Sequence, residues 1–399
     1  MTDKPQFVGK KVKLSDICSI VSGATPKTTV KDYWGGDIKW ITPSELNDDS
    51  HVIYNTAKHL TEAGFASARL RMFPEGTVLL TTRAPIGKVA IAGEPMCCNQ
   101  GFKNLVCSDA VNNEYLYRYL KNRSSELQAL GRGATFKELS KKEVAAYEIN
   151  LPPLKRQLEA VEKLALVDKQ VVIAKTQLDK LDSLVKSRFI EMFGDPVEEN
   201  RWARITLASL CTKLGSGATP RGGKAAYKTS GIPLIRSMNV HNGYFESKDL
   251  AYIDEIQAKK LDNVTLHKGD VLLNITGASV ARSCLLPDYL AGGRVNQHVS
   301  IVRCDPNRML PRVLNSIFTS DSYQRFLLEH SRMAGATREA ITKDDLETMT
   351  VPLPPLSLQY KFAAFVAQVD KSRFGGMLHL LNSLSGIMHA SFFSVADTD

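Results

Sequence analysis

A long stretch with regularly spaced apolar residues lies near the middle of the chain, between Leu151 and Gly194. Two prolines stand at its start and a Gly-Asp-Pro sequence closes it. Between these, apolar or small residues recur at alternating steps of three and four, interrupted once at Arg188. They are Ala160, Leu164, Val167, Val171, Ala174, Leu178, Leu181, Val185 and Met192. This heptad pattern predicts a helix that packs against a second helix. From residue 155 to 193 it would be about 58 Å long.

The same series of motifs occurs twice along the chain. SGATPK at 22–27 recurs as SGATPR at 216–221, a separation of 194 residues. Further pairs follow in the same order, and their separation rises to 202. They are GTVLL and GDVLL (76–80, 269–273), Asn-Gln (99–100, 296–297), Gly-Ala-Thr (133–135, 335–337), Leu-Pro-Pro-Leu (151–154, 353–356) and Val-Asp-Lys (167–169, 369–371). A repeat this long indicates a duplicated domain plus helix, not a solenoid.

Each copy combines short strand patterns with helical patterns. Strands are expected at 37–42, 77–82 and 104–107, and again at 232–236, 270–275 and 299–303. Helices are expected at 113–128 and 311–330. Ser140 with Glu143, and Thr342 with Asp345, have the spacing of a capping box at a helix start. Each globular part is therefore predicted to be a mixed domain of strands and helices.

The second copy also ends in a helical pattern, from about residue 356 to 393. Its apolar positions are Phe362, Val366, Val369, Met377, Leu380, Leu384 and Ile387. Gly375 and Gly376 interrupt this pattern, and two glycines cost about 2 kcal/mol relative to alanines. The predicted fold class is α+β: two mixed α/β domains separated by two long antiparallel coiled-coil helices, with an internal pseudo-two-fold repeat. The alternative is that each helix packs only on its own domain.

The charge excess lies in the globular segments. The chain has a formal net charge of +9, and residues 1–150 and 196–354 each hold 20 Lys and Arg against 16 Asp and Glu. Two equally basic segments favour a polyanionic partner such as nucleic acid, although solubility alone could explain a modest excess. The sequence shows neither an apolar run of about 20 residues nor a signal peptide, and its seven cysteines lack metal-ligand spacing. A cytoplasmic protein with reduced thiols is expected.

Motifs of known catalytic chemistry do not emerge from the sequence. Pro220 occupies the last glycine position of a dinucleotide-binding motif, and Gly87-Lys88 lacks the upstream glycine of a phosphate-binding loop. The Leu-Pro-Pro-Leu segments lack the polar and aromatic residues with which amino-methyltransferases hold an amine. His298 is expected to be a surface or packing residue and not a ligand. A duplicated chain also suits two similar targets better than one active site.

Several loop residues have the chemistry of DNA contacts. Cations, hydroxyls and glycine-rich backbone suit phosphates, and paired Asn-Gln amides can bond adenine at two points. The alternative is that these amides cap turns and the threonines bond locally. The predicted DNA-binding residues are Thr25, Lys27, Arg83, Lys88, Asn99, Gln100, Arg132, Thr135, Lys137, Thr219, Arg221, Arg282, Arg294, Asn296, Gln297, Thr337 and Arg338.

The whole arrangement resembles the specificity (S) subunit of type I restriction–modification systems. The resemblance rests on the Leu14–Cys18 and Leu207–Cys211 segments, the repeated SGATP, Asn-Gln, Gly-Ala-Thr and Leu-Pro-Pro-Leu motifs, and the two helices. It implies a target-recognition domain at 1–154, a central spacer helix at 155–195, a second target-recognition domain at 196–354, and a distal spacer helix and tail at 355–399.

By the same resemblance, each domain reads one half of a bipartite site in double-stranded DNA. The helices set the gap and dock two methyltransferase subunits, and restriction/translocase subunits complete the assembly. S-adenosylmethionine, ATP and magnesium are then expected on the partners and no cofactor or metal on this chain, which would not itself be an enzyme. Two other hypotheses remain: a coiled-coil adaptor for protein assembly with incidental basic lobes, and an enzyme with an unrecognised site.

Overall fold

The computed structural model describes residues 9–83, 85–132, 137–220, 222–333 and 340–373. Packing divides them into unit 1, up to residue 175, and unit 2, from residue 176 onward. The long helix α6 (Leu154–Phe193) contributes residues to both units. None of the helices in the described part of the chain has the length and apolar character needed to cross a membrane.

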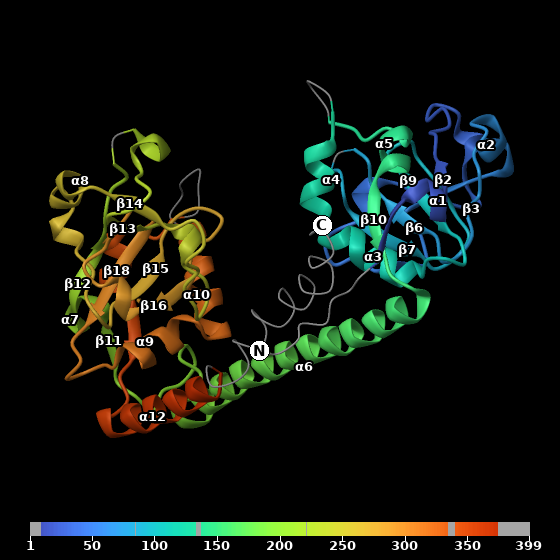
Figure 1. Cartoon of the computed structure of the whole chain (residues 1–399). Coiled ribbons are helices and arrows are strands. Elements are labelled where there is room, and N and C mark those ends of the chain that lie inside the picture. The colour runs from blue at the N-terminus through green and yellow to red at the C-terminus, as the bar shows by residue number, and fades with distance from the viewer. Residues whose placement is uncertain (1–8, 84, 133–136, 221, 334–339, 374–399) are drawn as a thin grey trace, which may run out of the picture. The chain divides into compact units, whose positions relative to one another are not determined.

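Unit 1 is built on two sheets and a strand pair (Figure 1). Strand β1 (Lys10–Lys13) pairs antiparallel with β10 (Glu148–Leu151). The larger sheet has the order β2-β9-β6-β7-β4 and the smaller β5-β3-β8. The strands are β2 (Cys18–Ser22), β3 (Trp34–Ile41), β4 (Val52–Ile53), β5 (Lys58–Leu60), β6 (Val78–Leu80), β7 (Val89–Ala92), β8 (Cys97–Cys98) and β9 (Lys103–Cys107). The helices are α1 (Leu14–Ile17), α2 (Glu62–Ser67), α3 (Asn113–Asn122), α4 (Ser124–Leu130) and α5 (Lys141–Ala146), with the 3-10 helices η1 (Lys31–Tyr33) and η2 (Pro43–Glu45).

Unit 2 has the same plan. Strand β11 (Arg204–Thr206) pairs antiparallel with β19 (Thr350–Pro352), and the two sheets have the orders β12-β18-β15-β16 and β14-β13-β17. The strands are β12 (Cys211–Ser216), β13 (Ile232–Ile235), β14 (Ala251–Ile253), β15 (Val271–Asn274), β16 (Ser283–Leu285), β17 (Arg294–Val295) and β18 (Val299–Cys304). The helices are α7 (Leu207–Leu210), α8 (Glu255–Lys259), α9 (Pro311–Phe318), α10 (Asp321–Met333), α11 (Lys343–Thr348) and α12 (Leu356–Ser372), with η3 (Gly223–Ala226), η4 (Ser237–Asn239), η5 (Asp262–Val264) and η6 (Asp288–Leu290).

The two units correspond in their strands, except that β4 at the edge of the larger sheet of unit 1 has no counterpart in the described part of unit 2. Cys18 lies opposite Cys107 in unit 1 as Cys211 lies opposite Cys304 in unit 2. The helix α3 packs on β6 and β7, and α9 packs on the matching strands β15 and β16. The predicted fold class and internal duplication are therefore confirmed. The pattern fits the physics of a mixed domain, because each sheet buries one apolar face beneath a helix.

Helices were predicted at 113–128 and 311–330, and each is divided into two in the structure. The predicted continuity of these helices was therefore wrong. The first is broken at Arg123, whose amide bonds back to Tyr119 and Leu120 in a tightened last turn. In the second copy Ser320 begins α10 by accepting a hydrogen bond from the Tyr323 amide at 3.4 Å. A side chain that caps a new helix competes with continuation of the old one.

Both predicted capping boxes are confirmed. The Ser140 hydroxyl accepts from the Glu143 amide at 3.2 Å, and the Glu143 carboxylate accepts from the Ser140 amide at 2.8 Å. These bonds to Ser140 hold the pKa of Glu143 below its usual value. Thr342 and Asp345 form the same reciprocal pair, at 3.1 and 2.8 Å.

A buried glutamine in the first turn of α6 fixes the helix to unit 1. The Gln157 side chain is fully buried, and its Oε1 accepts from the Asn112 amide at 2.8 Å. Its Nε2 donates to the carbonyls of Ala110 at 3.0 Å and Pro152 at 2.9 Å. One amide thus satisfies three backbone groups in the loop before α3 and at the helix entry.

Gln359 repeats this contact at the start of α12. Its Oε1 accepts from the Leu310 amide at 2.8 Å, and its Nε2 donates to the carbonyls of Arg308 at 2.9 Å and Pro354 at 2.8 Å. It too is fully buried. The same glutamine contact therefore occurs in both units, and we call it the glutamine clamp of each unit.

An ion pair strengthens each junction further along the helix. The Arg118 guanidinium lies 2.6 Å from the Asp168 carboxylate in unit 1, and Arg312 lies 3.2 Å from Asp370 in unit 2. These aspartates are the central residues of the two Val-Asp-Lys motifs. The motif therefore carries a helix-to-domain contact.

The helices α6 and α12 pack against each other within unit 2. The Phe362 ring centroid lies 5.6 Å from that of Phe189 and 5.5 Å from that of Phe193. Eleven residues after Phe362, Arg373 forms an ion pair with Asp182, which stands eleven residues before Phe193. Contacts that advance in opposite directions along the two helices confirm an antiparallel pair. The predicted positions from Gly375 onward, Met377 and Ile387 among them, lie outside the described residues.

We predict that Gln157→Ala and Gln359→Ala each lower the free energy of unfolding by about 3 kcal/mol. Each change leaves an amide and two carbonyls buried without their partner. Urea unfolding of each variant measures the loss. Gln170→Ala, at an exposed position of α6, is the matched control and should remain within about 0.5 kcal/mol of the parent. A clamp variant as stable as this control would contradict the role of the clamp.

Candidate nucleic-acid interface

In unit 1 the SGATP segment lies directly against the Asn-Gln turn. The Ala24 amide donates to the Cys98 carbonyl at 3.1 Å, and the Thr25 hydroxyl donates to Gln100 Oε1 at 2.5 Å. A Cβ at Gly23 would lie 1.9 Å from the Cys98 oxygen. The glycine is therefore needed for close approach of two backbone segments.

Unit 2 repeats the close approach and the threonine–glutamine bond, but its backbone bond lies one residue earlier in the SGATP segment and one residue later in the Asn-Gln turn. The Gly217 amide donates to the Asn296 carbonyl at 3.1 Å, and the Thr219 hydroxyl bonds to Gln297 Oε1. A Cβ at Gly217 would lie 1.8 Å from the Val295 oxygen. The repeated motif therefore encodes a specific loop–loop contact.

The asparagines of the Asn-Gln turns make local bonds. Asn99 Oδ1 accepts from the Gly101 amide at 2.8 Å, and Asn296 Oδ1 accepts from the His298 amide at 3.0 Å. Gln100 and Gln297, in contrast, are exposed. The glutamine is thus better placed than the asparagine to meet a ligand, and the turn-capping alternative applies to the asparagine.

The turn after β6 and the turn after β15 have matching backbones. The Thr81 amide donates to the Lys88 carbonyl at 2.9 Å, and the Asn274 amide donates to the Arg282 carbonyl at 2.8 Å. Lys88 and Arg282 therefore occupy equivalent positions. Their side chains differ in use: Lys88 Nζ donates to the Leu46 carbonyl at 2.9 Å, whereas Arg282 has no side-chain partner among the described residues.

The segment after each Gly-Ala-Thr motif returns to the same strand end. The Leu139 amide donates to the Thr82 carbonyl at 2.9 Å, and the Ile341 amide donates to the Ile275 carbonyl at 2.8 Å. Each unit thus gathers four segments, which we call its loop cluster. It comprises 23–28, 81–83, 85–88, 99–101, 132 and 137–139 in unit 1, and 217–220, 274–282, 296–298 and 340–341 in unit 2. Four predicted residues, Thr135, Arg221, Thr337 and Arg338, lie outside the described residues.

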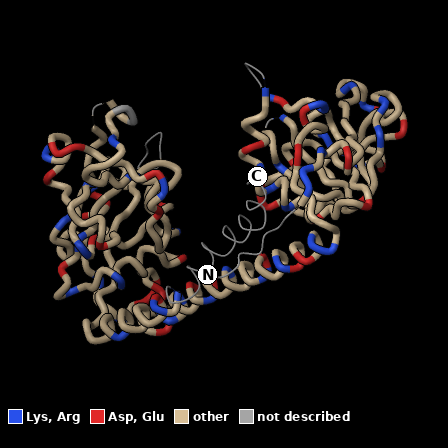
Figure 2. Tube along the Cα trace, viewed as in Figure 1, with Lys and Arg blue, Asp and Glu red and all other residues tan. Residues whose placement is uncertain are grey.

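Three predicted cations of unit 1 lie at the exposed side of its cluster. Lys27 and Lys137 are exposed, and Arg132 has a side chain 87% exposed that lies 3.2 Å from Glu143. Arg83 is half-buried, 3.8 Å from Glu138. Figure 2 shows Lys and Arg interspersed with Asp and Glu along the traces of both units. The two signs of charge are therefore mixed along the described trace of each unit.

Arg294 lies inside unit 2. Only 7% of it is exposed, and its guanidinium donates to the carbonyls of Ala258, Gly292 and Gly293 and to Asp262, the last at 2.7 Å. A guanidinium so fully bonded within its own domain has a structural role. Its burial therefore makes Arg294 a poor candidate for contact with DNA.

Comparison with known proteins identifies the family to which the chain belongs. Residues 9–183 match the family model described as the type I restriction modification DNA specificity domain. The chain is 30% identical over 378 residues to the type I restriction enzyme MjaIX specificity subunit of Methanocaldococcus jannaschii, covering 89% of this chain and 85% of that protein. The chain belongs to the type I restriction–modification specificity subunits. It is also 20% identical to the EcoKI specificity subunit of Escherichia coli K12, covering 75% of this chain and 68% of that one.

Solved structures share the fold of this specificity subunit. A chain from a type I restriction–modification assembly aligns over 97% of this chain and 98% of its own, with a TM-score of 0.58 and 18% identity. The S subunit of the M. genitalium type I system aligns over 100% and 99%, with a TM-score of 0.53 and 12% identity.

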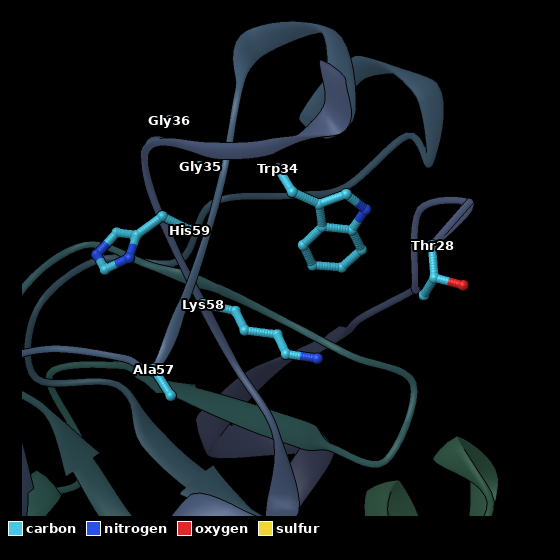
Figure 3. A pocket seen from close by; sticks show the side chains of 7 residues that line it. All are labelled: Thr28, Trp34, Gly35, Gly36, Ala57, Lys58 and His59. Carbon is cyan, nitrogen blue, oxygen red and sulfur yellow. The ribbon is translucent and has the colours of Figure 1, made fainter. Parts of the chain in front are cut away.

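Beside its loop cluster, unit 1 of the specificity subunit has a hollow that sequence reasoning missed. Thr28, Trp34, Gly35, Gly36, Ala57, Lys58 and His59 line this hollow of about 480 Å³ (Figure 3). The Lys58 ammonium lies 5.7 Å from the Trp34 ring centroid, and Trp34 Nε1 donates to the Lys27 carbonyl at 3.4 Å. The signal available in the sequence was the Trp34-Gly-Gly segment, which differs from its counterpart in the second copy.

Unit 2 has its own hollow within the cluster. It is about 440 Å³ in volume and is lined by Ser237, Met238, Thr276, Gly277, Ala278, Ser279, Arg282 and His298. His298 was expected to be a surface or packing residue, and it is half-buried and bonded to two side chains. The two units thus share a backbone frame and differ in the side chains around it.

The cysteines of the specificity subunit are free thiols. Burial raises the pKa of Cys97, Cys211 and Cys284 to about 12. These thiols are protonated at neutral pH, which is the unreactive form. Their role is packing in the sheets.

We predict that Gly23→Ala and Gly217→Ala each destabilise the chain by about 3 kcal/mol, because the added Cβ meets a backbone oxygen that cannot rotate away. Urea unfolding measures the cost, and faster hydrogen exchange at the amides of residues 24 and 217 should accompany it. Gly35→Ala is the control: its Cβ meets nothing within 4 Å, so only the positive φ of 86° opposes it, at about 1 kcal/mol. Equal costs at all three positions would contradict the loop–loop contact.

Proposed function

We propose that this specificity subunit reads a bipartite site in double-stranded DNA, with one loop cluster on each half-site. The observation that supports it most is the pair of clusters with matching backbone bonds and different side chains. A shared frame suits a shared ligand, the DNA duplex, and different side chains suit different half-sites.

The clusters contain the groups that DNA contacts require. Lys27, Arg132 and Lys137 are exposed cations of the first cluster that suit phosphates. Gln100 and Gln297 are exposed amides, each bonded through Oε1 to a threonine hydroxyl and each with further hydrogen-bonding capacity. Phosphate contacts position the domain, and amide contacts to base edges discriminate sequence.

The helices are proposed to set the distance between half-sites and to dock partner subunits. The glutamine clamps and the Arg–Asp pairs tie each long helix to its own domain. Along α6, apolar side chains remain exposed on the chain itself, as at Leu166, which is 63% exposed. Others are Leu158, Ile173, Leu184 and Ile190. Surfaces of this kind suit protein partners.

The proposed partners are two methyltransferase subunits and the restriction/translocase subunits, with S-adenosylmethionine, ATP and magnesium bound by them. The chain itself is proposed to be non-catalytic and to act in the cytoplasm. The adaptor hypothesis is a second candidate, and the exposed apolar residues of α6 favour it equally. DNA selectivity distinguishes the two.

The test is a mobility-shift assay with the subunit reconstituted with its methyltransferase partners. Duplexes that carry the methylated motif of the host genome should bind at least about a thousandfold more tightly than random duplexes. Equal binding to both would contradict DNA reading and leave the adaptor hypothesis.

Charge removal supplies a matched comparison in the same assay. Lys27→Ala and Lys137→Ala should each weaken binding to all duplexes and reduce the salt slope by about 1, because each removes one phosphate contact. Lys163→Ala, an exposed position of α6, removes the same charge outside the clusters and should leave binding unchanged. An equal loss from all three changes would point to general electrostatics and not to the cluster.

A further inference from the structure

A chain of side-chain hydrogen bonds crosses the second loop cluster. The Thr219 hydroxyl donates to Gln297 Oε1, and Gln297 Nε2 lies 3.2 Å from His298 Nε2. His298 Nδ1 lies 2.5 Å from the Thr276 hydroxyl oxygen. Four side chains from three segments are thus linked end to end.

The bonds from Thr219 and His298 hold the two ends of the Gln297 amide. Because Gln297 Oε1 accepts from Thr219, the amide NH₂ faces His298, and Nε2 of the ring accepts from it. The ring proton then lies on Nδ1 and is donated to Thr276. Exchange of the oxygen and nitrogen of Gln297 reverses these bonds but breaks none, because threonine hydroxyls donate or accept and the imidazole has two tautomers. The network therefore fixes the position of the amide group by holding it at both ends.

The first loop cluster lacks this chain. Gly101 and His298 occupy the same position, since the carbonyl of Gly101 accepts from Thr82 at 2.8 Å and that of His298 accepts from Ile275 at 3.0 Å. Gly101 has no side chain to hold Gln100, whose side chain bonds Thr25 alone within the described part of the chain. The device is therefore specific to unit 2.

The side-chain amide of Gln297 lies beside the hollow of unit 2. His298 and Thr276 form part of its lining, together with Arg282, whose guanidinium has no partner among the described residues. Met238, 45% exposed, adds an apolar surface to the lining. After its two internal bonds Gln297 still has one N–H and one lone pair of Oε1 to offer.

We infer that Gln297 is a base-reading residue of the second half-site and that His298 is its positioning residue. The inference rests on the proposed function. An amide held at both ends offers a donor and an acceptor from a fixed position, and this pair matches the N7 and N6–H₂ groups of adenine in the major groove. An amide that is not held in position would reach other base edges as well and discriminate less.

The test is a competition assay with the complex reconstituted with its methyltransferase subunits. The competitors are duplexes with each base pair of both half-sites replaced in turn. His298→Ala should reduce discrimination at one position of the second half-site by about tenfold and leave the first half-site profile unchanged. Thr276→Val, which keeps the imidazole and removes its Nδ1 partner, should act at the same position with a smaller effect.

His267→Ala is the matched control, because this exposed histidine precedes β15 and lies outside the loop cluster. An unchanged second half-site profile in both His298→Ala and Thr276→Val would overturn the inference. Uniform weakening at every position, with a reduced salt slope, would overturn it too and indicate a phosphate contact. If the parent complex itself shows no selectivity, the proposed function fails instead, so the two failures are distinct.

Discussion

The buried glutamine at the start of each long helix is the contact on which the rest of the structure depends. Gln157 and Gln359 each satisfy an amide and two carbonyls where the chain passes from domain to helix. Prolines precede both residues and restrict the backbone at the same place. A helix held in this way cannot swing on its domain without leaving buried polar groups unbonded, which costs several kcal/mol. Rigid junctions are what a spacer between two reading domains requires.

Duplication explains how two recognition domains can share a frame and still differ. In each unit the SGATP segment meets the Asn-Gln turn through a threonine–glutamine bond, and the turns after β6 and β15 are closed by equivalent backbone bonds. The side chains on this frame have diverged: Gly101 corresponds to His298, and Lys88, which bonds the Leu46 carbonyl, corresponds to Arg282, for which the described residues supply no side-chain partner. The first unit adds the Trp34–Lys58 hollow (Figure 3). Backbone bonds preserve the architecture, so the exposed side chains can change without unfolding the domain.

The repeat made much of the fold predictable, since a motif found twice at a constant order marks a structural constraint. Strand patterns, capping boxes and the heptad of α6 followed from periodicity and spacing. The divided helices did not, because the Arg123 amide bonds back in a tightened last turn and the Ser320 hydroxyl caps a new helix. The burial of Arg294 could not be predicted from the sequence either, since a guanidinium can bond a ligand or three carbonyls of its own domain. The hydrogen bonds of His298 depend on contacts between loops far apart in the sequence.

The central claim is that the helices measure the gap between two half-sites. Removal of residues 170–176 keeps the heptad phase of α6 and shortens it by about 10 Å, which is about three base pairs of B-DNA. The decisive measurement is the set of sites methylated by the reconstituted complex on a library in which the gap between half-sites varies. The account predicts the same two half-sites with a shorter preferred gap. An unchanged gap, or altered half-sites, would contradict it.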